Sequence, residues 1–111
     1  MKVLKIMPNQ PPLEREMDNT LEALQSEVGG YFETISLPWT IVIICNEDGV
    51  NLKFPVSRTL VFKSNSGNAY NVPIHGVFII CGTDGEEFRG LTDIEIQDLK
   101  KQFSPDRVII K

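Results

Sequence analysis

A seven-residue pattern that occurs twice constrains the fold of this chain more than any other feature. Residues 43–49 and residues 79–85 both read Ile-Ile-Cys-x-x-Asp-Gly. Each copy is a short apolar run typical of a buried strand, followed by a dipeptide favoured in tight hairpin turns. We therefore expect two neighbouring core strands with similar polar turns. Chance and shared strand-turn chemistry explain the repeat better than a duplicated half-domain, because the sequences that flank the two copies align poorly.

Length and charge narrow the class of protein. A chain of 111 residues fits one domain. The net charge of −4 disfavours nucleic acid as a partner, because binding a phosphate backbone requires a basic surface. No run approaches the ~20 apolar residues of a membrane-spanning helix, and residues 1–8 alternate charged and apolar side chains, unlike a signal peptide. We expect a cytoplasmic protein without membrane contact.

Hydrophobic periodicity and turn residues predict the elements. Helix one begins at an Asn19 N-cap and ends at the Gly29-Gly30 pair. Helix two begins at Thr92, which forms a capping box with Glu95, and ends at residues 104–105. Residues 63–71 are rich in Ser, Asn and Gly and predict the longest surface loop. The predicted strands cover residues 2–7, 13–17, 31–37, 40–46, 50–54, 58–62 and 75–82, and a short return strand begins near Phe88.

These elements predict a single α+β domain over residues 1–103. Its mostly antiparallel sheet has about five or six strands, and two helices pack on one face. Residues 104–111 form either a last strand or an apolar tail, Val108 to Ile110, that packs on a partner.

Residues with reactive or metal-binding side chains are few. Cys45, Cys81 and His75 are the only soft metal ligands, and they lack the paired spacing of a zinc site. The apolar neighbours of both cysteines favour core packing over a reactive thiolate. The acidic turns after the two strands favour solvated hairpins over a cation site or an acid–base pair. The sequence predicts no cofactor, no metal site and no catalytic centre.

Several stretches, in this order, resemble a small bacterial and phage family, the domain of unknown function 3846. The stretches are Leu21 to Gln25, Val28 to Glu33, Ile44 to Gly49, Gly76 to Ile80, and Leu91 to Asp93. The resemblance runs from about residue 2 to residue 103. The family pattern Pro-x-Asn-Arg corresponds here to residues 55–58, where Arg58 matches and Ser57 departs from it.

The resemblance implies a phage or mobile-element context but no activity. Its polar motif positions here are Gln25, Glu33, Asn46, Glu47 and Arg58, which suit either a site beside turns or structural roles such as capping.

We expect a non-enzymatic binding protein for a nucleotide-like molecule or a host protein, one that blunts a host defence. Arg58 would meet an anion, Asn46 would hydrogen-bond, and Trp39 or Tyr70 would stack. The alternatives are a protein-interaction or oligomerisation module, in which Trp39 is an aromatic anchor, and a small hydrolase that uses the acidic turns.

Overall fold

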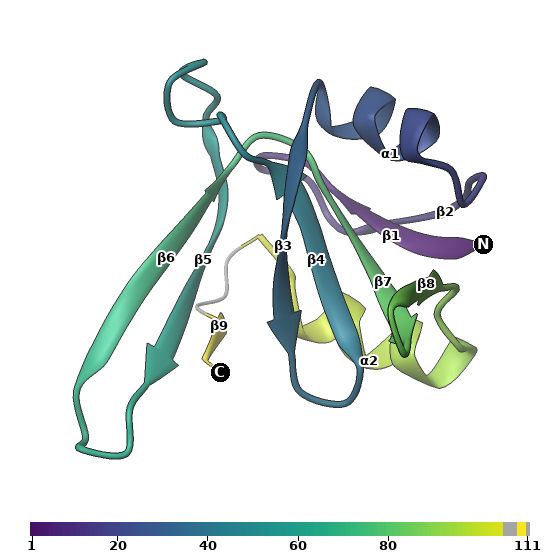
Figure 1. Ribbon diagram of the computed structural model, residues 1–111. Helices are drawn as coiled ribbons and strands as arrows, with labels where there is room; N and C mark the ends of the chain where they lie inside the picture. The colour runs from purple at the N-terminus through teal and green to yellow at the C-terminus, as the bar shows by residue number, and fades with distance from the viewer. Residues whose placement is uncertain (106–108, 111) are drawn as a thin grey trace.

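The computed structural model describes residues 1–105, 109 and 110, which form one α+β arrangement (Figure 1). The elements in chain order are β1 (Lys2–Ile6), β2 (Leu13–Glu16), α1 (Leu21–Val28), β3 (Phe32–Leu37), β4 (Ile41–Asn46), β5 (Val56–Lys63), β6 (Ala69–His75), β7 (Phe78–Asp84), β8 (Glu87–Arg89), α2 (Asp93–Gln102) and β9 (Ile109–Ile110). Neither helix in this part of the chain is long and apolar enough to span a bilayer.

The two copies of the repeated pattern form the centre of the larger sheet. Its strand order is β2-β1-β7-β4-β3, with β8 paired to β7, and all its pairs are antiparallel. The registers Ile43↔Ile80 and Ile44↔Ile79 place the isoleucine pairs of the two copies opposite each other. The predicted α+β class and the predicted pair of adjacent core strands are confirmed.

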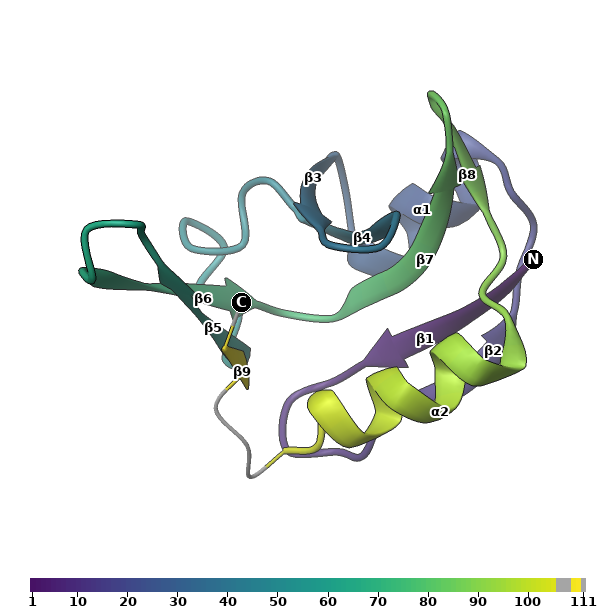
Figure 2. The ribbon, with the colours of Figure 1, turned by 90° about the horizontal axis from the view of Figure 1, so that it is seen from below.

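The helices cover opposite faces of this sheet, and the expectation that both pack on one face is wrong (Figure 2). Side chains alternate between faces along a strand. Ile43 and Ile80 therefore pack with Ile96 and Leu99 of α2. Their neighbours in the strands pack instead in a second cluster with Leu24 and Val28 of α1. Every residue of β4 is buried, so both faces of the sheet need a covering layer.

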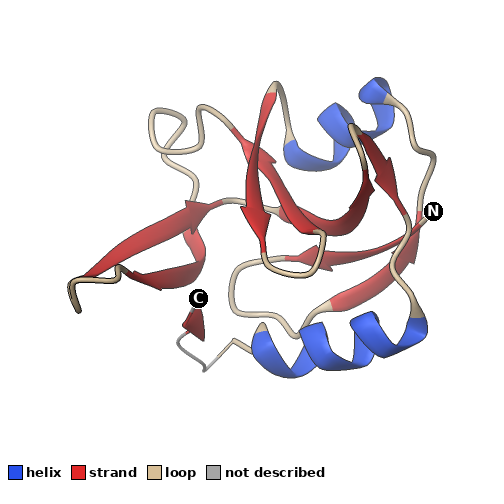
Figure 3. Ribbon diagram, turned by 60° about the horizontal axis from the view of Figure 1, so that its bottom comes forward, coloured by secondary structure: helices blue, strands red, loops and turns tan. Residues whose placement is uncertain are grey.

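A second, three-stranded sheet lies beside the first, in the order β6-β5-β9 (Figure 3). It adds Leu60, Ile74 and Ile109 to the cluster that α2 covers. Most of the loop predicted over residues 63–71 is a β-hairpin, because Lys63 pairs with Ala69 and β6 continues to His75. The strand predicted over residues 50–54 does not form, because residues 47–53 make a series of turns. The last strand pairs in parallel with β5, and Val108 lies outside the described residues.

Capping residues set the helix ends. Thr92 and Glu95 form the predicted capping box at α2. The N-cap of α1 is Thr20, whose side chain accepts from the Ala23 N–H, so the prediction of Asn19 was wrong by one residue. Asn19 Nδ2 donates instead to the Phe88 carbonyl at 2.9 Å. Gly29, with φ of 82°, ends α1 as predicted.

Candidate functional site

Arg58 does not reach the surface, although we expected it to meet an anionic ligand. Its side chain is buried, with 3% exposed. Nε donates to the Phe103 carbonyl at 2.8 Å, Nη1 to the carbonyls of Ser57 and Met7, and Nη2 to that of Gln10 at 2.5 Å. The guanidinium joins three distant backbone segments, which argues against a role in ligand binding.

Asn46 also has a structural role. It is buried at the end of β4, where Nδ2 donates to the Val28 carbonyl at 3.0 Å and Oδ1 accepts from the Asp48 N–H at 2.7 Å. Val28 ends α1, so its carbonyl has no intrahelical partner and accepts from Asn46 instead. The carbonyl of Gln25, one turn earlier, accepts from the N–H groups of Gly29 and Gly30. Asn46 thus joins the end of α1 to the sheet, and the backbone carbonyl of Gln25 closes the last turn of the helix.

Glu33 and Glu47 are exposed and share a depression with Asn46. The depression has a volume of about 470 Å³, and its lining also includes Asp48 and Tyr31. It faces the C-terminal end of α1, which carries partial negative charge. Three carboxylates and a helix C-terminus repel an anion, so a nucleotide-like ligand does not suit this end of the sheet.

The other predicted groups lie elsewhere. Tyr70 stacks on Phe62 of the adjacent strand with ring centroids 5.5 Å apart. His75 Nδ1 lies 2.9 Å from the Phe54 carbonyl. Cys45 and Cys81 are buried on opposite faces of the sheet, and burial raises the pKa of each thiol to about 12. No group of three or more metal-binding side chains comes together in the part of the chain that the structure describes.

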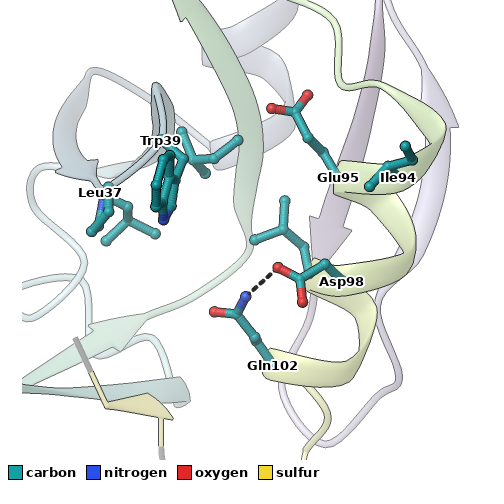
Figure 4. A pocket seen from close by; sticks show the side chains of 9 residues that line it. Leu37, Trp39, Ile94, Glu95, Asp98 and Gln102 are labelled. Carbon is teal, nitrogen blue, oxygen red and sulfur yellow. Dashed lines mark hydrogen bonds between the residues drawn. The ribbon is translucent and has the colours of Figure 1, made fainter.

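Trp39 lies at a separate place, on a groove between the β3–β4 turn and α2 (Figure 4). This Trp39 groove has a volume of about 540 Å³, within the ~300–1,000 Å³ of typical ligand clefts. It is lined by Leu37, Pro38, Trp39 and Ile41 on one side, and by Ile94, Glu95, Asp98, Leu99 and Gln102 on the other. Trp39 and Ile94 are the two most exposed large apolar residues in the described chain, at 90% and 84%.

The turn that carries Trp39 has an unfavourable backbone. Trp39 has φ of 67° and Thr40 has φ of 58°, in the left-handed region where glycine or asparagine is preferred and a β-branched residue is an outlier. The Trp39 ring buries almost none of its surface, so packing does not offset this strain. Strain that packing does not offset motivates a functional explanation for this turn.

Arg89 connects the two walls of the groove. Its Nη1 and Nη2 donate to the two carboxylate oxygens of Glu95 in α2, both at 2.9 Å, and Nη2 also donates to Thr40 Oγ1 at 2.9 Å. Thr40 Oγ1 in turn donates to the Trp39 carbonyl at 2.6 Å. A bidentate arginine–carboxylate pair has a fixed geometry, so this network holds the Trp39 turn at a set distance from α2.

Sequence reasoning found Trp39 but missed Ile94 and Arg89. Ile94 carries a signal in the sequence, because an isoleucine at the second helical position lies off the stripe formed by Ile96, Leu99 and Phe103. Arg89 carries none, because its role depends on β7, β8 and the β3–β4 turn lying side by side.

The fold and the groove define a small α+β domain with an apolar surface cleft and a structural core arginine. The family model of a domain of unknown function, DUF3846, matches residues 1–104. The chain therefore belongs to this family, as the sequence motifs predicted. The comparisons with curated proteins and with solved structures found no match.

Proposed function

We propose that the protein is a non-enzymatic binding protein that seats a segment of a partner protein in the Trp39 groove. The observation that carries the proposal is the position of Trp39 and Ile94, whose apolar side chains are almost fully exposed on one groove. Aromatic anchors beside aliphatic pockets dominate the energy of protein interfaces. The strained φ angles of Trp39 and Thr40 support it, because the fold itself gains nothing from a tryptophan at this turn.

The groove is also preorganised. Arg89 joins both walls before any partner arrives, which reduces the conformational entropy lost on binding. Buried Leu37, Ile41 and Leu99 give the groove an apolar floor. A partner side chain inserted there would lose its contact with water and gain packing contacts.

A small nucleotide-like ligand is less well supported. Of the residues predicted to bind it, Arg58 and Asn46 use their polar groups within the fold, and Glu33 and Glu47 carry the wrong charge for phosphate. The phage or mobile-element origin, the cytoplasmic location and a role against host defence stay predictions from the sequence. We expect no rise in melting temperature with cyclic or ADP-ribose-type nucleotides in a thermal-shift assay.

A displayed library of random 12-residue peptides tests the proposal. The library is selected on the wild type and counter-selected on the Trp39→Ala/Ile94→Ser double variant. The control variant, Leu21→Ser/Tyr31→Ala, removes two exposed apolar residues, one at the start of α1 and one just after its end. We expect peptides that bind the wild type and the control equally and the groove variant at least about tenfold more weakly. If no peptide survives the counter-selection, or if the surviving peptides bind all three proteins alike, the proposal is wrong.

A further inference from the structure

We infer that the partner segment is an apolar stretch flanked by lysine or arginine; this inference rests on the proposed function. The charges around the Trp39 groove support it. Among the described residues that line the groove, the charged ones are Glu95 and Asp98. Glu95 is neutralised by Arg89. Asp98 accepts a hydrogen bond from Gln102 at 2.7 Å and makes no ion pair within the described residues.

More carboxylates lie next to the wall of the groove that carries Trp39. The β3–β4 turn is joined to β7, because the Thr83 N–H donates to the Thr40 carbonyl at 2.9 Å. The chain then enters the β7–β8 hairpin, where Asp84, Glu86 and Glu87 are exposed. The acidic hairpin therefore begins beside the wall of the groove that carries Trp39, and Asp98 lies on the opposite wall, on α2.

This arrangement favours a basic partner over a second copy of the chain. Complementary charges at the rim of an interface steer the encounter and select the partner. Two copies would each bring a net charge of −4 and would repel each other. An acidic partner would place like charges together around a groove whose floor is apolar.

The composition of the selected peptides tests the inference. Among peptides whose binding depends on the groove, we expect lysine and arginine to outnumber aspartate and glutamate by at least about threefold in the positions that flank the apolar core. Groove-dependent peptides with neutral or acidic flanks would overturn the inference and leave the proposed function standing. Absence of any groove-dependent peptide would overturn both.

Salt and single-charge variants test it further. For the tightest groove-dependent peptide, the dissociation constant should rise about tenfold between 50 and 500 mM NaCl, because salt screens exposed charges. Asp98→Asn should weaken binding about threefold and reduce the salt dependence. The matched control, Glu22→Gln on α1, should change binding less than about twofold. Equal effects of the two variants would overturn the inference.

Analytical ultracentrifugation of the free protein provides the last test. We expect the wild type and the Trp39→Ala/Ile94→Ser variant to sediment alike across the concentration range. A dimer that forms in the wild type and is lost in the groove variant would show that a second copy occupies the groove, and would overturn the inference.

Discussion

The two copies of the repeated pattern lie side by side and antiparallel, so their polar ends sit at opposite ends of the strand pair. At the first end, the Asn46 side chain turns inward and holds the end of α1. At the second end, the corresponding position is Gly82, and a Cβ atom there would overlap the guanidinium of Arg89. The Asn46 side chain joins the sheet to α1, whereas the lack of a side chain at Gly82 leaves room for Arg89, which joins the sheet to α2.

The Asp-Gly dipeptides that follow differ in the same way. Gly85 has φ of 65° in a two-residue hairpin turn, the conformation that favours glycine. Gly49 has no positive φ, and a Cβ atom there would lie 3.0 Å from the His75 carbonyl oxygen. Glycine is favoured at position 85 by its backbone conformation, and at position 49 because a side chain would contact His75. The same short pattern therefore closes one end of the sheet against a helix and leaves the other beside an open groove.

Asn46→Ala is the strongest way to break the first end. Removing the amide leaves the Val28 carbonyl and the Asp48 N–H without their partner. We expect a loss of about 2–3 kcal/mol in the free energy of unfolding, the usual penalty for buried unsatisfied groups, measured by urea denaturation. Asn51→Ala, which removes an exposed bond to Asp48 in the same loop, should change it by less than about 0.5 kcal/mol. Equal losses would contradict the assigned role of Asn46.

Gly82→Ala breaks the second end through Arg89. The new methyl group should displace the guanidinium from Glu95 and Thr40, with a loss of about 1–2 kcal/mol in the free energy of unfolding. The same substitution in an Arg89→Ala background should be nearly neutral. A double-mutant cycle by urea denaturation should therefore give a coupling energy of about 1 kcal/mol. Additive effects would show that Gly82 is needed for a reason other than Arg89.

How far the sequence predicts this molecule depends on whether a feature is local. The capping box at Thr92 and the stop at Gly29 depend on residues within one turn, and both were predictable. The covering of both sheet faces follows from the apolar residues 41–45 of β4, whose side chains point alternately to the two faces. The sequence shows this apolar run, but the prediction placed both helices on one face. Most of β5 was predicted, but β6 was missed because the polar residues around the β5–β6 turn match a loop composition.

The site was predictable only in part, for the same reason. The sequence marks Trp39 as a candidate anchor, because it is an aromatic residue that follows Pro38 between two predicted strands. The partners of Arg58 lie in segments far apart in the chain, so its burial cannot be inferred from the neighbouring residues. A polar residue beside a turn serves equally well as a ligand or as a cap, and only the position of α1 assigns Asn46 to capping.

The Arg89–Glu95 ion pair, at the Gly82 end of the strand pair, makes the free energy of unfolding depend on pH. Hydrogen bonding to Arg89, aided by the Thr92 N–H, lowers the pKa of this carboxyl from 4.5 to about 2. Because the folded pKa is the lower one, the stabilisation is present above pH 4.5 and is lost as the pH falls towards 2. Glu95→Gln should cost about 1 kcal/mol at pH 7, since solvent screens this partly exposed pair. Its unfolding free energy should converge with that of the wild type between pH 4.5 and 2. A constant difference would mean that the Arg89–Glu95 ion pair does not stabilise the fold.

The smallest expected effect has the opposite sign. Trp39→Asn replaces a ring that is 90% exposed with a residue that tolerates a φ of 67°. No packing is lost and backbone strain is relieved, so the free energy of unfolding should rise by about 0.5 kcal/mol, measured by urea denaturation. Peptides that depend on the groove should nevertheless bind this variant more weakly.

Tyr70→Asn, in the exposed β5–β6 hairpin, serves as the control and should lower the free energy of unfolding, because the Tyr70 ring stacks on Phe62. A loss of stability in Trp39→Asn would mean that the tryptophan is retained for the fold and would leave the Trp39 groove without its main support.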